Sequence, residues 1–226
     1  MGSSTSPAST PATGVAKYLS RTDLGVHSPW AANPGVTEAP VLSCRKSFHI
    51  FMTDGAWNTA PYNSRDAAGL DNQRIVRGGN ADNTSITLPD GVKYDTASPQ
   101  TRLYRDNWGS PTASTLSDLA FYYWSRDLQP GLANNVRPSP KKQWPRQNFG
   151  TSQRPAELDA YWNPRNDPAT WQHMVTYTIG FNDAAAWTGP PIWSGDTFNN
   201  LGDLVRGDVG WATAHACNRT PPRPCA

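Results

Sequence analysis

The hydrophobic pattern of the chain centres on one short apolar run, SFHIFMTDG at residues 47–55, which stops abruptly at Thr-Asp-Gly. Its apolar positions are nearly continuous, a pattern typical of a β-strand covered on both faces in a parallel sheet flanked by helices. Asp54 then lies at the carboxyl end of the strand, where open α/β sheets bind their ligands. The simpler interpretation is that Asp54 and Gly55 form an ordinary turn, because both residue types favour turns.

Three segments have a helical pattern. Pro11 suits a first helical turn, so we expect a helix over residues 12–20 with Thr10 as its N-cap. The strongest pattern covers residues 115–128, where Leu, Leu, Ala, Tyr and Trp recur at i, i+3, i+4, i+7 and i+8. An aromatic stripe at this spacing is typical of the core-facing side of a helix. Residues 197–205 predict one further short helix.

A second buried strand is predicted over residues 174–179. Strand, insertion, helix, insertion and strand therefore follow one another, an order that predicts an α/β layered fold with a right-handed crossover. The insertions cover about residues 56–113 and 133–168 and are rich in Asn and Pro. We assign the second of them to the surface.

The first insertion is too long for a structureless loop in a compact domain, so we expect it to contain small strands of its own. Residues 84–88 alternate and are followed by Asp90-Gly91, which indicates a hairpin. We assign residues 1–211 to one domain with its insertions and residues 212–226 to an irregular C-terminal tail.

Composition narrows the class of protein. Hydrophobic residues make up 37% of the chain while Pro (21), Gly (18) and Trp (10) are abundant, which indicates a modest core carrying long, aromatic-rich loops. The net charge of +2 is small and the basic residues are scattered, so no nucleic-acid surface is expected. No apolar stretch approaches the ~20 residues of a membrane span. The polar opening lacks a leader pattern and has the character of a loop inside a longer protein.

Motifs of common enzymes are missing from the sequence. The four histidines form no HExxH pair, and neither a Gly-x-Ser-x-Gly elbow nor a nucleotide-binding glycine loop occurs. His49 alternates with apolar neighbours and is expected to hydrogen-bond in or beside the sheet. Cys44, Cys217 and Cys225 have no zinc-type spacing, although the last two are placed to bridge in an oxidising compartment. We therefore expect no enzyme.

Two further features suggest binding surfaces. Arg206-Gly207-Asp208 is the tripeptide that integrins recognise, and as a ligand-binding hypothesis it requires an exposed loop. Aromatic residues crowd the insertions, where they either form an interface or anchor the loops to the sheet. These residues are Trp57, Tyr62, Tyr94, Tyr104, Trp108, Trp144, Tyr161, Trp162, Trp187 and Trp193.

Three segments taken in order carry a family resemblance: FHIFMTDGAWN at 48–58, STLSDLAFYYW at 114–124 and DPATWQHMVTYTIG at 167–180. Together they resemble the von Willebrand factor type A domain of the type IV pilus tip-associated adhesin and biogenesis family, the PilC/PilY-like proteins. The match spans roughly residues 8 to 211. It implies a partial von Willebrand factor A-like, Rossmann-like α/β layered sheet with helices on both faces, incomplete at its N-terminus.

The resemblance also implies a metal-ion-dependent adhesion site that holds Mg, Mn or Ca. Asp54 matches the acid of the family's third metal-binding loop, and Thr10 matches the threonine of the second. The first loop, Asp-x-Ser-x-Ser, does not occur in this sequence. The chain is then either the downstream part of a larger protein, the explanation we favour, or a degenerate homologue. The family's C-terminal β-propeller, with its own calcium loop, is not present either.

The function that the resemblance implies is a non-enzymatic module for type IV pilus biogenesis and tip adhesion. It would bind an acidic ligand through the partly encoded ion site, with pilin or minor pilin subunits and a host-cell or surface ligand as partners. The full-length protein would lie at the cell surface, the pilus tip or the outer membrane of a bacterium. The alternative is a metal-free structural domain that packs against pilin subunits or against a C-terminal propeller.

Overall fold

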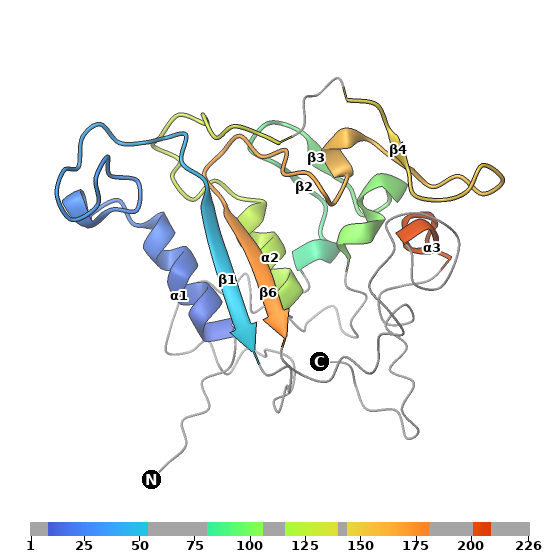
Figure 1. Cartoon of the computed structure of the whole chain (residues 1–226), viewed down its shortest axis with the longest axis horizontal. Coiled ribbons are helices and arrows are strands. Elements are labelled where there is room, and N and C mark those ends of the chain that lie inside the picture. The colour runs from blue at the N-terminus through green and yellow to red at the C-terminus, as the bar shows by residue number, and fades with distance from the viewer. Residues whose placement is uncertain (1–8, 54–80, 106–115, 140–143, 181–200, 209–226) are drawn as a thin grey trace, which may run out of the picture.

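The computed structural model describes residues 9–53, 81–105, 116–139, 144–180 and 201–208 (Figure 1). Short 3-10 helices at 25–27, 81–83, 99–104 and 160–162 connect the longer elements. In chain order the α-helices and strands are α1 (Ser9–Ser20), β1 (Ser47–Thr53), β2 (Ile86–Thr87), β3 (Lys93–Tyr94), α2 (Leu116–Trp124), β4 (Gln147–Asn148), β5 (Glu157–Leu158), β6 (Met174–Gly180) and α3 (Leu201–Arg206).

The two apolar runs of the sequence form the longest strands, and these pair in parallel. Ser47 lies opposite Met174 and Thr53 opposite Gly180, so β1 and β6 are in register over their full length. The other described pairs, β2 with β3 and β4 with β5, are short and antiparallel. A parallel pair accompanied by helices agrees with the predicted α/β class.

Helices α1 and α2 pack on one face of this parallel pair, with α1 against β1 and α2 against β6 (Figure 1). The first helix begins at Ser9, three residues before the predicted start, so Thr10 lies inside its first turn rather than at the cap. Helix α2 ends at Trp124 rather than Leu128, because the Leu128 N–H donates instead to the Gln172 carbonyl at 2.7 Å. The predicted core role of its aromatic stripe is confirmed by the burial of the α2 side chains at Leu119 and Tyr123.

The prediction that the first strand is covered on both faces is wrong for the described part of the chain. His49 and Phe51 are buried beneath the helices, whereas Phe48, Ile50 and Met52 on the opposite face are 55%, 62% and 59% exposed. The described helices therefore cover one face of the β1–β6 pair, not both. The continuous apolar run indicated that each side chain favours burial. It did not indicate which faces of the strand the described helices cover.

The assignment of residues 133–168 to the surface is wrong for part of this segment. Phe149 and Leu158 are completely buried and pack with Leu103 and α3 in a core cluster of their own. Trp162 is buried in another cluster, beside Tyr94 and Trp171. These buried residues lie at irregular spacing among Pro and Asn residues. Their burial could therefore not be predicted from a helical or strand period.

The predicted hairpin in the first insertion is confirmed. Strands β2 and β3 flank a turn in which Gly91 has a φ of 85°, a conformation that glycine adopts without steric cost. Tyr94 on β3 is completely buried, and its hydroxyl donates to the Asp82 carbonyl at 2.5 Å. Tyr94 and Trp162 therefore anchor loops to the fold. Among the described residues, no helix is long and apolar enough to cross a membrane.

Candidate functional site

The carboxyl end of β1 is where the sequence predicts the metal-binding residues. Asp54 lies outside the described residues, which end here at Thr53. Thr10 lies in the first turn of α1. Figure 1 shows the N-terminal end of α1 and the carboxyl end of β1 at the same end of the molecule, and the two elements are in contact. The backbone arrangement is thus compatible with the predicted pair, which stays a prediction.

The second predicted site, Arg206-Gly207-Asp208, forms the C-terminal cap of α3. Gly207 has a φ of 80° and its N–H donates to the carbonyls of Asp203 and Leu204, at 2.9 and 3.1 Å. The Asp208 N–H donates to the Asp203 carbonyl at 2.9 Å. This is the Schellman arrangement, in which a glycine in the left-handed region satisfies the last carbonyls of a helix. The tripeptide therefore has a structural task independent of any ligand.

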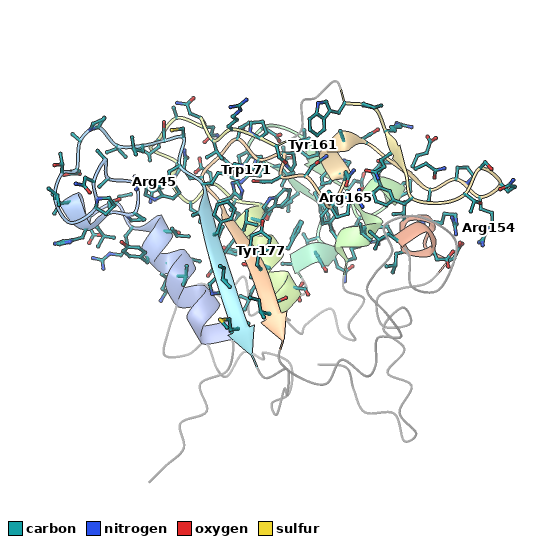
Figure 2. All side chains as sticks on the ribbon, viewed as in Figure 1. Arg45, Arg154, Tyr161, Arg165, Trp171 and Tyr177 are labelled. Carbon is teal, nitrogen blue, oxygen red and sulfur yellow. The ribbon has the colours of Figure 1, made fainter. Side chains whose placement is uncertain are left out.

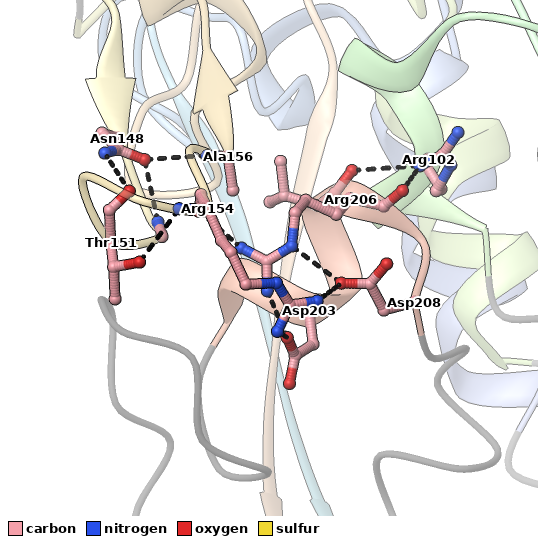
Figure 3. A network of polar contacts seen from close by, with 10 residues as sticks. Arg102, Asn148, Thr151, Arg154, Ala156, Asp203, Arg206 and Asp208 are labelled. Carbon is pink, nitrogen blue, oxygen red and sulfur yellow. Dashed lines mark hydrogen bonds and ion pairs between the residues drawn. The ribbon is translucent and has the colours of Figure 1, made fainter.

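The charged groups of the tripeptide are engaged with one another (Figure 3). The Arg206 Nε donates to the Asp208 carboxylate at 2.7 Å, and a second guanidinium nitrogen of Arg206 pairs with Asp203. The same Asp208 carboxylate accepts from Arg154 Nη2 at 2.7 Å. Arg154 lies in the turn between β4 and β5, so one aspartate links that hairpin to α3.

The backbone of the tripeptide is held from the other side by Arg102. Its guanidinium donates to the Arg206 carbonyl and, at 3.4 Å, to the Val205 carbonyl. The positive φ of Gly207 favours glycine, and a Cβ at this position would displace the Arg102 side chain. The Arg206 side chain is only 14% exposed, whereas those of Asp208 and Arg154 are 41% and 54% exposed.

A third cluster joins the beginnings of β1 and β6, and sequence reasoning assigned it no role. The Asp167 carboxylate lies 3.2 Å from His173 Nε2 and 3.3 Å from Lys46 Nζ, and it accepts from Trp124 Nε1 at 3.4 Å. On the other side of the ring, His173 Nδ1 lies 2.7 Å from the Trp171 carbonyl. Each ring nitrogen of His173 thus faces an oxygen that accepts hydrogen bonds.

The groups around Asp167 lower the pKa of its carboxyl. Burial by itself raises the pKa of this carboxyl, but the hydrogen bond and charge of His173, the charge of Lys46 and the Trp124 hydrogen bond outweigh burial and lower the pKa to about 2. The His173 side chain is 1% exposed, so its contact with Asp167 is largely shielded from water. Asp167 and His173 both lie in the segment DPATWQHMVTYTIG, where an acid and a histidine among apolar residues were the available signal.

His49 lies on the helix-covered face of β1, in register with Thr176. Burial lowers the pKa of its ring, and its Nδ1 has no hydrogen-bond partner within the described part of the chain. The Thr176 hydroxyl is likewise buried without a partner there. The hydrogen bond expected of His49 is therefore not made by its Nδ1 within the described part of the chain.

A hollow of about 460 Å³ lies beside the C-terminal ends of α1 and α2, lined in part by Lys17, Arg21 and Arg126. Cations are favoured at the carbonyl ends of helices. Arg21 pairs with the Asp23 carboxylate at 2.7 Å, and the Arg126 guanidinium lies 4.2 Å above the Tyr122 ring. The basic lining is therefore accounted for by the fold. Within the described ranges, no group of three or more His, Cys, Asp or Glu side chains is placed to hold a metal.

Comparison with known proteins gives a consistent result. The chain is 41% identical over 203 residues to the type IV pilus biogenesis factor PilY1 of Pseudomonas aeruginosa strain PAO1, a match that covers 89% of this chain and 15% of that protein. The protein of the same name from strain PAK is 39% identical over 203 residues, covering 89% and 14%. That of strain UCBPP-PA14 is 38% identical over 176 residues, covering 77% and 12%.

These proteins are homologues of the chain over most of its length, which supports the pilus part of the resemblance found in the sequence. The chain spans about one seventh of the length of these curated relatives. No family model matches the chain, and no solved structure is significantly similar to it.

Proposed function

We propose that this chain is a non-enzymatic module of a type IV pilus biogenesis protein that acts at the bacterial surface. The observation that carries the proposal is the 41% identity, over 89% of the chain, to a type IV pilus biogenesis factor. Two further proteins with the same name match most of the chain as well. Contacts with pilin or minor pilin subunits are the proposed task of such a module.

A segment exchange tests this proposal. We expect that replacing the matching segment of PilY1 in strain PAO1 by this chain restores surface pili and twitching motility in a strain that lacks PilY1. The reason is that homologous segments with a shared core keep the same contacts with the rest of the assembly. Sheared surface pilin is the measurement.

The matched control is an exchange carrying Leu119→Asp, which places a charge in the core at a side chain that is 1% exposed. We expect this control to abolish piliation through misfolding. An unsubstituted exchange that is produced and secreted at normal levels but gives no pili would count against the proposal.

The finer proposal is a von Willebrand factor A-like domain that captures an acidic ligand through a divalent ion. Asp54 and Thr10 would supply two of the oxygen ligands, a chemistry suited to hard cations. Mg²⁺ prefers about six oxygens, so two ligands are too few and the rest of the site would come from residues outside this chain. The ion would then present an open position to a carboxylate of the ligand.

Calorimetry separates this proposal from its alternative. On a polypeptide that extends this chain upstream of Met1, we expect Mg²⁺ or Mn²⁺ titration to release heat that Asp54→Ala abolishes. Asp23→Ala is the control, because Asp23 is an exposed carboxylate paired with Arg21. Equal heats for the two variants would contradict the metal site and favour a metal-free structural domain.

The alternative is a metal-free domain whose loops pack against pilin subunits or against a C-terminal propeller. In its favour, Tyr94 and Trp162 use their rings to secure the insertions to the core. Trp144 is an aromatic residue of the described part of the second insertion that does not take part in this anchoring, and its side chain is 47% exposed. A rigid loop surface of this kind suits packing against another subunit.

The tripeptide at residues 206–208 is proposed as a ligand-binding motif whose availability depends on Arg154. A receptor that recognises both Arg206 and Asp208 must compete with the ion pairs that these residues already make. We expect Arg154→Ala to free one side of Asp208 and raise binding of a soluble Arg-Gly-Asp-recognising integrin about two- to fivefold, the scale of one surface ion pair.

Arg146→Ala is the matched control, since Arg146 makes a comparable exposed ion pair with Asp159 away from the tripeptide. Its integrin binding, measured by surface plasmon resonance, should equal that of the unsubstituted chain. If Arg154→Ala binds no better than this control, the tripeptide is a helix cap and not a ligand.

A further inference from the structure

The hollow beside the C-terminal ends of α1 and α2 is lined by more basic than acidic side chains. Lys17 and Arg21 line it on the α1 side, and Arg126 and Asp127 line it just after the end of α2. Arg21 is paired with the exposed carboxylate of Asp23, which neutralises its charge. The volume of the hollow, about 460 Å³, lies in the range of small-ligand sites.

Uncharged side chains supply hydrogen bonds to the helix ends beside this hollow. The Leu19 carbonyl near the end of α1 accepts from Trp30 Nε1 and from Gln129 Nε2, at 2.9 and 2.7 Å. At the end of α2, the Trp124 carbonyl accepts from Trp171 Nε1 at 2.8 Å. The helix dipoles explain why cations are favoured at this place, but capping of these carbonyls does not require the basic side chains.

Arg126 is the basic side chain of the hollow whose hydrogen-bonding groups are unused. Its guanidinium carbon lies 4.2 Å above the ring of Tyr122, a buried side chain that gives it a fixed platform. Within the part of the chain that the structure describes, the Arg126 guanidinium makes no hydrogen bond and no ion pair. A guanidinium has five N–H donors in a planar fork, so Arg126 presents donors without an oxygen partner at the hollow.

We propose that this hollow binds a single carboxylate through the guanidinium of Arg126. A guanidinium fork and a carboxylate have matching geometry and form two parallel charge-assisted hydrogen bonds. One fork suits one carboxylate, whereas a phosphate group, with a charge of about −2, requires more positive charge. The Asp127 carboxylate in the same lining further disfavours a doubly charged anion. The bound carboxylate belongs either to an acidic side chain of a partner protein or to a free carboxylic acid.

Titration of the ¹⁵N-labelled 226-residue chain, followed by NMR at the backbone amides of residues 126–128, tests the proposal. The probes are acetate and the capped peptide Gly-Gly-Glu-Gly-Gly, with the corresponding Gln peptide as the uncharged control. We expect both carboxylate probes to shift these resonances. Arg126→Ala should raise the dissociation constant about tenfold or more, because charge-assisted hydrogen bonds are lost. Arg126→Lys keeps the charge but lacks the fork, so we expect a rise of about three- to tenfold.

Arg154→Ala is the matched control, because it removes the same charge from a side chain that is 54% exposed. Figure 2 shows Arg154 at the opposite side of the molecule from α1, so this substitution should change the dissociation constant less than about twofold. The test is independent of the metal site and of any pilus activity, since the hollow lies at the other end of α1 from Thr10.

The two carboxylate probes also distinguish the sources of the ligand. Tighter binding of the Glu peptide than of acetate supports the proposal with a partner protein as the source, and equal affinities support it with a free acid. Equal binding of the Glu and Gln peptides, or of the Arg126→Ala and Arg154→Ala variants, overturns the proposal. Unchanged binding in Arg126→Lys, or tighter binding of inorganic phosphate than of acetate, overturns it as well.

Discussion

Trp171→Ala is expected to lower the free energy of unfolding by about 3–5 kcal/mol, the range measured for removing a fully buried aromatic side chain. Trp171 is completely buried. Its indole N–H donates to the Trp124 carbonyl at 2.8 Å, and the two indole rings pack edge to face with centroids 5.7 Å apart. The residue therefore secures the end of α2 to the segment that leads into β6. Urea denaturation followed by far-UV circular dichroism measures the loss.

Two companion variants make the result interpretable. Trp171→Phe keeps most of the apolar volume but leaves the Trp124 carbonyl without its donor, so we expect a smaller loss of about 1–3 kcal/mol. Trp144→Ala removes an indole that is 47% exposed and should cost less than about 1 kcal/mol. If Trp171→Ala and Trp144→Ala are equally stable, Trp171 does not belong to the core of the folded protein.

The core around Trp171 also shows which buried residues can be predicted from the sequence and which cannot. The two long strands and the core-facing stripe of α2 were predicted, because their apolar residues recur at the period of one element. Phe149, Leu158 and Trp162 were assigned to the surface although they are buried. Phe149 follows the two-residue strand β4, Leu158 lies on the two-residue strand β5 and Trp162 lies in a three-residue 3-10 helix. Elements this short show no period, so only the packed fold identifies which of their side chains are buried.

The candidate sites show the same division. The position of the predicted tripeptide was evident from three letters, but its Schellman geometry depends on Asp203 and Leu204, and its ion pairs on Arg154, 52 residues before Arg206. The pairing of Asp167 with His173 and Lys46 was equally hidden, since Lys46 lies 121 residues from Asp167. Charge pairing between residues far apart in the chain leaves no local pattern, so it cannot be predicted from a single sequence.

Asp167→Asn is expected to cost about 3 kcal/mol, the lower end of the range for removing one partner of a buried ion pair. The His173 side chain is buried, and in Asp167→Asn its Nε2 no longer faces a negatively charged oxygen. Lys46 loses its partner in the same substitution. Because the cluster joins the beginnings of β1 and β6, we expect the loss to appear in global unfolding by urea at pH 7.

The pH dependence of stability follows from the lowered pKa of Asp167. An aspartate with a pKa of about 2 in the folded protein and about 3.9 in the unfolded chain stabilises the fold by roughly 2–3 kcal/mol at pH values well above its unfolded pKa. As the pH falls from about 4 towards 2, the unfolded chain binds the proton first and this stabilisation is lost. The difference in stability between the unsubstituted protein and Asp167→Asn should therefore shrink across this window.

Asp159→Asn is the matched control, because Asp159 pairs with Arg146 at the surface, where both side chains are more than 40% exposed. Exposed ion pairs contribute at most about 1 kcal/mol, so this variant should remain close to the unsubstituted protein at pH 7. A loss for Asp167→Asn no greater than that for Asp159→Asn would show that the buried pair does not stabilise the fold. A difference that stays constant from pH 4 to pH 2 would instead place the cause in packing, because a volume effect does not titrate.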